Sequence, residues 1–205
     1  MPAVASILLA SLLLLSACAQ MAKAPQTAAQ TETIFESQVK AIPQERRRAI
    51  MAKLEREVVG ISTGTGAPNK AIVLFDPHCS YCSELWRATR PLEDQIDFVW
   101  VPVSIYGDES SAHCASILDS KDPLRMMADN EQAMRLTGKA VRVSSVPSTS
   151  ALASVAKNTE AMEDLDPALR VQGVPVTYYR AADGRVEIVD GALDTHLLKA
   201  AFKLK

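Results

Sequence analysis

Two cysteines separated by two residues, Cys79 and Cys82, are the residues whose types and spacing point most directly to chemistry. They follow an apolar run at 71–74, which predicts a buried strand that leads into a helix. In the first turn of a helix, backbone N–H groups without intrahelical partners stabilise a thiolate, which is the reactive form of cysteine. The spacing therefore predicts thiol–disulfide exchange, with Cys79 as the nucleophile and Cys82 as the resolving thiol.

A CxxC pair can also be half of a zinc site, or it can form a purely structural disulfide. A structural disulfide over so short a loop would remove little entropy from the unfolded chain. Zinc needs two further ligands at a suitable spacing, and no second CxxC or CxxH occurs. We therefore expect a redox pair and no metal or other cofactor. The other cysteines and histidines are Cys18, Cys114, His78, His113 and His196.

The N-terminal residues predict export across a membrane. Residues 7–15 are almost wholly aliphatic, but they are too few to span a bilayer as a helix, so residues 1–18 read as a signal peptide. The segment 15–18, Leu-Ser-Ala-Cys, resembles the bacterial lipobox, in which the cysteine, here Cys18, is lipidated. We expect a periplasmic protein anchored by lipid at Cys18, since disulfides persist in that compartment. Ordinary cleavage at the small-x-small sequence Ala-Cys-Ala is the alternative, and it would give a soluble periplasmic protein.

The segment between the signal and the cysteines is expected to hold a tether and one helix. Residues 19–42 are rich in Ala, Gln and Thr without apolar periodicity, which is typical of a flexible tether. Residues 43–57 predict an amphipathic helix that begins at Pro43, with its three consecutive arginines (46–48) on a solvated face. Its apolar stripe (Ile50, Leu54 and Val58) either packs on the chain's own domain or pairs with a second protomer, so a homodimer is possible.

Residues 58–205 are predicted to form one α/β domain. The formal net charge of −2 argues against a nucleic-acid partner. The expected elements are strands near 58–61 and 97–105, about sixty residues of helical pattern with start signals at Asp122 and Ser148, a strand at 173–179, a hairpin turn at 183–184, a strand at 185–189 and a helix at 194–203.

This order of elements, together with several short motifs, resembles the thioredoxin superfamily, and most closely the periplasmic disulfide isomerases of the DsbC and DsbG type. The resemblance covers about residues 58–203 and implies a thioredoxin-like fold with a helical insertion between the CxxC half and the cis-proline half. The motifs that carry it are Phe75-Asp76-Pro77, Tyr81, Trp86, residues 99–103 and 114–123, Asn158, Gly173-Val174-Pro175 and Asp183-Gly184.

The resemblance also implies roles for residues outside the CxxC pair. Pro175 would be the cis-proline whose loop packs against the cysteines, Val174 would bind the substrate backbone, and Tyr81 would shape the substrate groove. Isomerases of this type tend to carry threonine at the position of Val174, and valine resembles the oxidase branch. A membrane electron donor of the DsbD type is implied as a partner.

We therefore expect an isomerase or reductase acting on exported cysteine-containing proteins. A dithiol oxidase is the alternative, as is a chaperone or assembly lipoprotein without turnover. His78 either favours the Cys79 thiolate or only packs in its loop. Cys114 shares a helical face with Ile117 and Leu118, so we expect a buried small hydrophobe rather than a third redox thiol.

Lipid anchoring is tested by Cys18→Ser. We expect this variant to lose lipid labelling and membrane fractionation, because the lipobox requires its cysteine, while thermal unfolding of the domain stays unchanged. The residue after the cysteine is Ala19 and not aspartate, and in this the sequence resembles lipoproteins of the outer membrane. Wild type should therefore fractionate with the outer membrane. Unchanged fractionation of Cys18→Ser would favour ordinary cleavage.

Overall fold

A five-stranded mixed sheet forms the centre of the computed structural model, which describes residues 42–165 and 173–204. Its strand order is β1-β3-β2-β4-β5; β2 and β3 run parallel, and the other neighbours are antiparallel. The strands are β1 (Ile61–Ser62), β2 (Asn69–Phe75), β3 (Ile96–Pro102), β4 (Val176–Arg180) and β5 (Val186–Asp190).

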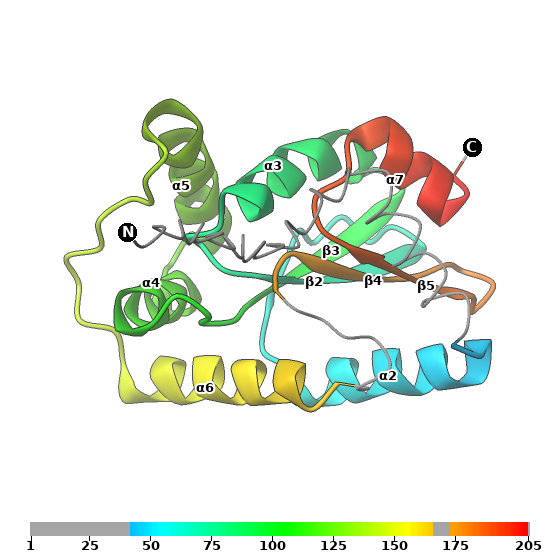
Figure 1. Ribbon diagram of the computed structural model, residues 1–205, viewed down its shortest axis with the longest axis horizontal. Coiled ribbons are helices and arrows are strands. Elements are labelled where there is room, and N and C mark those ends of the chain that lie inside the picture. Colours follow the sequence, from blue (N-terminus) through cyan, green and yellow to red (C-terminus); the bar gives the residue numbers. More distant parts are fainter. Residues whose placement is uncertain (1–41, 166–172, 205) are drawn as a thin grey trace, which may run out of the picture.

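Helices cover both faces of this sheet (Figure 1). Helices α3 and α7 lie on one face, α2 and α6 lie on the other, and α4 and α5 stand at the end of the sheet where β2 leads into α3. None of the helices in the described part of the chain is long and apolar enough to cross a membrane. The helices are α2 (Gln44–Glu57), α3 (Ser80–Thr89), the 3-10 turn η1 (Arg90–Leu92), α4 (Asp108–Asp119), α5 (Pro123–Thr137), α6 (Thr149–Glu163) and α7 (Thr195–Phe202).

Successive side chains of the central strand β2 pack alternately into the cores on the two faces of the sheet. Val73 and Phe75 pack into the core under α3 and α7, whereas Ile72 and Leu74 pack into the core under α2. All five residues from 71 to 75 are buried, so the predicted buried strand before the cysteines is confirmed. The strand therefore delivers the cysteine pair to the edge of a rigid core.

Two predicted helix starts are confirmed, and the first predicted strand is shifted. Asp122 and Ser148 are the N-cap residues of α5 and α6, and each side chain accepts a backbone N–H of the first helical turn. The first strand, expected at 58–61, is β1 at Ile61–Ser62. Gly60, just before it, lies so close to β3 that a Cβ atom there would come within 2.8 Å of Val101. Pro102 is the last residue of β3, beyond the two positions at which β1 pairs with that strand, so its missing N–H removes no bond to β1.

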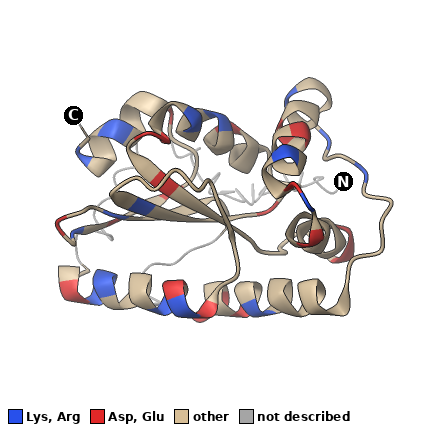
Figure 2. Cartoon of the chain, turned by 180° about the vertical axis from the view of Figure 1, so that it is seen from behind, with Lys and Arg blue, Asp and Glu red and all other residues tan. Residues whose placement is uncertain are grey.

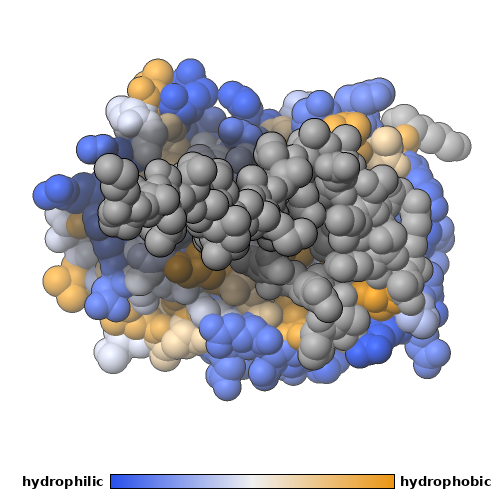
Figure 3. Space-filling model, viewed as in Figure 1, coloured by the Kyte–Doolittle hydropathy of each residue, from blue (hydrophilic) through white to orange (hydrophobic). Residues whose placement is uncertain are grey.

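Helix α2 packs on the sheet of its own chain. Ile50, Met51 and Leu54 are buried in the core with residues of β2 and β4. The stripe that could have paired with a second protomer is thus covered within the chain. Acidic and basic residues are interspersed along α2 (Figure 2), and hydrophilic residues cover much of the outline of the molecule, with hydrophobic ones between them (Figure 3). The expected tether and Cys18 lie outside the described residues.

The expectation of a fully solvated arginine face on α2 is wrong for Arg47. Its side chain is buried because it bridges α2 and the edge strand β5: Nη1 donates to Glu187 Oε2 at 2.8 Å, and Nε donates to the Ile42 carbonyl at 2.9 Å. Its neighbour Arg48 is exposed. Position 47 therefore fixes the helix to the sheet by polar contacts as well as by the apolar stripe.

We expect Arg47→Ala to lower the free energy of unfolding by about 1.5 to 3 kcal/mol, the range for hydrogen bonds to charged groups. Arg185 also donates to Glu187, so that carboxylate keeps a partner and the loss should not exceed this range. Arg48→Ala on the exposed side of the same helix is the matched control, and urea unfolding measures both. Equal stabilities would show that α2 is held by its apolar stripe alone.

Candidate active site

Cys79 is the N-cap residue of α3, with its sulfur at the start of the helix. The Cys82 N–H donates to Cys79 Sγ at 3.4 Å, and the Cys79 thiol donates to the Val174 carbonyl at 3.3 Å. Hydrogen bonds from the Cys82 side chain and from the N–H groups of Cys82 and Tyr81 lower the pKa of Cys79 to about 7, although burial opposes them. The predicted nucleophile therefore ionises near neutral pH.

Cys82 lies one turn behind it in a different environment. Burial raises the pKa of Cys82 well above its ordinary value, and the hydrogen bond and charge of Cys79 raise it further. As whole residues the two are almost equally covered, with exposed fractions of 3 % for Cys79 and 2 % for Cys82. Their thiols nevertheless differ in ionisation, as the predicted roles of attacking and resolving thiol require.

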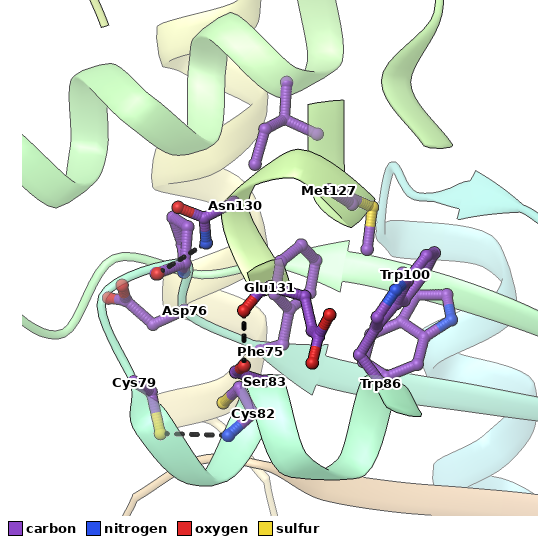
Figure 4. Close-up of a pocket in the computed structure, with 12 residues that line it drawn as sticks. Phe75, Asp76, Cys79, Cys82, Ser83, Trp86, Trp100, Met127, Asn130 and Glu131 are labelled. Carbon is purple, nitrogen blue, oxygen red and sulfur yellow. Dashed lines mark hydrogen bonds between the residues drawn. The ribbon is translucent and has the colours of Figure 1, made fainter. Parts of the chain in front are cut away.

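Asp76 holds the turn that carries Cys79 (Figure 4). This carboxylate is completely buried and accepts three hydrogen bonds. Oδ1 accepts the His78 N–H at 2.8 Å, while Oδ2 accepts the Ile105 N–H at 2.9 Å and the Ser110 hydroxyl. One side chain therefore joins the cysteine turn to the loop after β3 and to α4.

Helix α5 of the insertion holds the same turn from another side. Asn130 Nδ2 donates to the Pro77 carbonyl at 2.8 Å, and Ser83 Oγ in α3 donates to the Glu131 carbonyl at 3.4 Å (Figure 4). A cavity of about 20 Å³ lies between these elements and is lined by both cysteines, Trp86 and Trp100. The helical insertion is thus part of the active-site scaffold.

The resemblance-based substrate residues surround Cys79 as expected. The Val174–Pro175 peptide bond is cis, and the Val174 carbonyl contacts the Cys79 sulfur. Tyr81 projects from the first turn of α3 with 62 % of its surface exposed. The structure thus places Cys82 and Val174 in contact with the Cys79 sulfur and leaves Tyr81 exposed in the first turn of α3.

The remaining histidine and cysteine candidates lie behind this cluster. The rings of His78 and His113 meet edge to face with centroids 5.4 Å apart, which supports the packing interpretation of His78. Burial lowers the pKa of His113 to about 4. Cys114 is fully buried and donates to the Val103 carbonyl at 3.5 Å, and burial raises its pKa, so the expectation of a buried small hydrophobe is confirmed.

Sequence reasoning missed the residues that hold the turn. Asp76 was noted only as part of a motif, although an acidic residue directly after a buried apolar strand is a signal for a functional or structural carboxylate. Nothing in the local pattern marks Asn130 or Ser110, because each reaches the site across more than thirty residues of chain. Within 42–165 and 173–204, no three His, Cys, Asp or Glu side chains are grouped so that they could hold a metal ion.

Comparison with known proteins identifies the domain. Residues 57–204 match a family model described as a thioredoxin-like domain. The chain belongs to this thioredoxin-like family. The fold and the resemblance inferred from the motifs are thereby confirmed.

The curated relatives are thiol–disulfide proteins. The chain is 32 % identical over 114 residues to the thiol:disulfide interchange protein DsbG of Pseudomonas aeruginosa, covering 50 % of this chain and 44 % of the relative. It is 38 % identical over 61 residues to DsbG of Escherichia coli, covering 29 % and 25 %. These matches span less than half the length of either relative.

Solved structures share the fold at lower identity. A periplasmic thioredoxin-like protein from Salmonella enterica serovar Typhimurium superposes with a TM-score of 0.53 at 18 % identity, covering 76 % of this chain and 94 % of that chain. The catalytic domain of Proteus mirabilis ScsC superposes with a TM-score of 0.51 at 20 % identity, covering 78 % and 96 %. These likenesses establish the arrangement of helices and strands.

We expect Cys79 to be the first cysteine alkylated in the reduced protein. Its pKa of about 7 means that the alkylation rate should rise about tenfold per pH unit in acid and level off above neutrality, because only the thiolate reacts. Cys82 and Cys114 should stay unmodified at about pH 6, since burial raises the pKa of both. Peptide mass spectrometry after iodoacetamide treatment measures this order, and modification of Cys82 first would reverse the assigned roles.

Proposed function

We propose that the protein is a periplasmic thiol–disulfide oxidoreductase that acts on exported cysteine-containing proteins, chiefly as an isomerase or reductase. The observation that carries this proposal is the contrast between two neighbouring thiols, one ionised near neutral pH and the other held protonated by burial. An exchange catalyst needs this asymmetry, because one sulfur must attack while the other waits. The partial likeness to the DsbG proteins supports the same chemistry.

The reaction begins with the Cys79 thiolate attacking one sulfur of a substrate disulfide. A Cys79–substrate disulfide forms, the substrate S–S bond breaks, and its electron pair leaves with the second substrate sulfur. In the reductase branch, Cys82 loses its proton and attacks Cys79 Sγ, which releases the substrate dithiol and leaves the Cys79–Cys82 pair oxidised. In the isomerase branch, a substrate thiolate attacks the mixed disulfide instead, and Cys79 departs unchanged in oxidation state.

The ionisation of Cys79 favours the reductase and isomerase directions. A strongly oxidising exchange protein such as DsbA has a nucleophile with a pKa of about 3.5, because its reduced form is greatly stabilised as thiolate. The pKa of Cys79, about 7, resembles that of thioredoxin and gives much less of this stabilisation. We therefore infer that the oxidised pair is not a strong oxidant.

A dithiol oxidase is the second candidate, and Val174 is the residue that favours it. Val174 precedes the cis-proline, and its carbonyl contacts the Cys79 sulfur. A valine at this position resembles the oxidase branch. The two candidates differ in the state of the cysteine pair in cells. Trapping of free thiols should find Cys79 and Cys82 mostly reduced for an isomerase or reductase and mostly oxidised for an oxidase.

The partners follow from this chemistry. In the oxidising periplasm, a reductase or isomerase must be reduced again after each net reduction, so we include a membrane electron donor of the DsbD type in the proposal. Lipid at Cys18 would keep the domain at the membrane, and Ala19 after the cysteine favours the outer membrane. A soluble periplasmic form would carry out the same exchange without that anchor.

Reduction of insulin disulfides, with dithiothreitol as the reductant and the protein as the catalyst, is the test of catalysis. Wild type should accelerate insulin precipitation, and Cys79→Ser should abolish the acceleration because the attacking sulfur is gone. Cys114→Ala is the matched control, since that thiol is buried away from the exchange pair. A wild-type protein without any acceleration would favour a chaperone or assembly role without turnover.

Cys82→Ser tests in cells which of the two thiols attacks and which resolves. Attack by Cys79 remains possible in this variant while the resolving step is lost, so disulfide-linked adducts with substrate should accumulate. Non-reducing gels of cells that express the variant detect them. Adducts in Cys79→Ser but not in Cys82→Ser would assign the nucleophile to Cys82.

A further inference from the structure

A buried indole nitrogen belongs to the wall of the cavity behind the cysteines. Trp100 is 1 % exposed and lines this cavity of about 20 Å³ together with Cys82 and Glu131. Within the described residues, its Nε1 has no hydrogen-bond partner. An unpaired buried donor is costly, and ordered water usually supplies the missing partner. A cavity of roughly 10 to 15 Å³ already holds one water molecule, so the space and the unpaired donor together indicate a water-binding site.

Glu131 reaches the same cavity from helix α5. Its backbone carbonyl accepts the Ser83 hydroxyl at 3.4 Å, which fixes this turn of α5 against α3. Its carboxylate lies between Ser83 and the tryptophan rings (Figure 4), and the residue is only partly buried. In the described part of the chain, no hydrogen bond or ion pair engages this carboxylate. Glu131 therefore joins the cavity to solvent and keeps its full capacity to accept a proton.

The resolving thiol needs such an acceptor. Burial raises the pKa of Cys82, so this thiol keeps its proton at neutral pH, whereas only a thiolate attacks a disulfide. The residue is 2 % exposed, so bulk water has little access to it. The proton that Cys82 loses in the resolving step must therefore pass to a group that lines the cavity.

Asp76 is the other carboxylate of this cavity, but its hydrogen bonds make it a poor acceptor. Its two oxygens already accept the N–H groups of His78 and Ile105 and the hydroxyl of Ser110. A proton on either oxygen would compete with one of these donors and leave it poorly satisfied in the protein interior. The titratable side chains of the cavity wall are the two cysteines and these two carboxylates, which leaves Glu131 as the acceptor.

We propose that Glu131 accepts the proton of Cys82 in the resolving step, through one water molecule held in the cavity by Trp100 Nε1. This inference rests on the proposed function. The Cys82 thiol gives its proton to the water, and the water gives one of its own to the Glu131 carboxylate. The Cys82 thiolate then forms an S–S bond with Cys79, the bond from Cys79 to the substrate breaks, and its electron pair leaves with the substrate sulfur. Glu131 returns the proton to solvent.

The proposal gives the helical insertion a part in the choice between the two branches of the reaction. The reductase branch needs the deprotonation of Cys82, whereas the isomerase branch uses a substrate thiolate and leaves Cys82 protonated. Loss of the Glu131 carboxylate should therefore slow resolution without slowing the first attack by Cys79.

Glu131→Gln tests the inference, because it removes the carboxylate and keeps the size of the side chain. The full exported chain, with Cys18→Ser so that no thiol remains outside the domain, is reduced and mixed with one equivalent of dithiobis(nitrobenzoate). Attack by Cys79 releases the first thionitrobenzoate and resolution by Cys82 releases the second, so visible absorbance records the two steps separately. At about pH 6, the first phase should be unchanged and the second about a hundredfold slower, the lower end of the range for positioned proton transfer.

The pH dependence and two further variants separate proton transfer from a structural role. In Glu131→Gln, hydroxide must remove the proton, so the difference from wild type should shrink about tenfold per pH unit. Glu131→Asp should recover part of the rate, because it restores a carboxylate. Asp129→Asn is the matched control: its carboxylate lies on the same helix in an exposed ion pair with Arg125, and both phases should keep their wild-type rates.

The outcomes distinguish this inference from the proposed function. A wild-type second phase in Glu131→Gln, or a loss of the same size at every pH, would overturn the inference and leave the proposed function standing. Wild-type protein that neither releases the second thionitrobenzoate nor reduces insulin would overturn both.

Discussion

The buried carboxylate of Asp76 is the constraint on which the active site depends. Removing a charge from water is costly unless hydrogen-bond donors replace the solvent, and Asp76 receives them from His78, Ile105 and Ser110. Each donor belongs to a different segment, so satisfying one side chain brings the cysteine turn, the loop after β3 and α4 into a fixed arrangement. Loss of any donor would leave a buried acceptor incompletely satisfied.

The helical insertion completes this arrangement. Helices α4 and α5 supply Ser110 and Asn130, and Asn130 holds the Pro77 carbonyl while its own Oδ1 accepts the Val141 N–H. Helix α6 supplies Asn158, whose amide bonds the backbone of Val59 and Pro102. The insertion is thus tied both to the cysteine turn and to the strand beside it. Its role extends beyond covering the end of the sheet.

The asymmetry between the two thiols follows from this scaffold. Cys79 lies at the helix start, where the Cys82 N–H donates to its sulfur, whereas Cys82 lies in the core one turn later. Desolvation favours the neutral thiol at both positions, but at Cys79 hydrogen bonds to the charged form outweigh it. Two residues of the same type, three positions apart, therefore differ in ionisation, as the proposed roles of attacking and resolving thiol require.

The sequence alone predicted the redox pair and determined most of the local structure. The CxxC spacing after a buried apolar run, the N-caps at Asp122 and Ser148 and the hairpin turn at 183–184 depend on neighbours along the chain, so short-range patterns predict them. The proline at 175 was identified by resemblance, and its cis peptide bond is found in the structure.

Only the tertiary structure decided what those patterns could not specify. The periodicity of α2 left open whether Ile50 and Leu54 pack on the chain itself, and it placed Arg47 with the solvated arginines, whereas an ion pair across 140 residues of chain buries it. The Asp76 carboxylate lies in the cysteine turn itself, but two of its donors, the Ile105 N–H and the Ser110 hydroxyl, come from positions 29 and 34 residues further along the chain. Ionisation depends on desolvation and on groups brought together in space, which packing determines and local sequence does not.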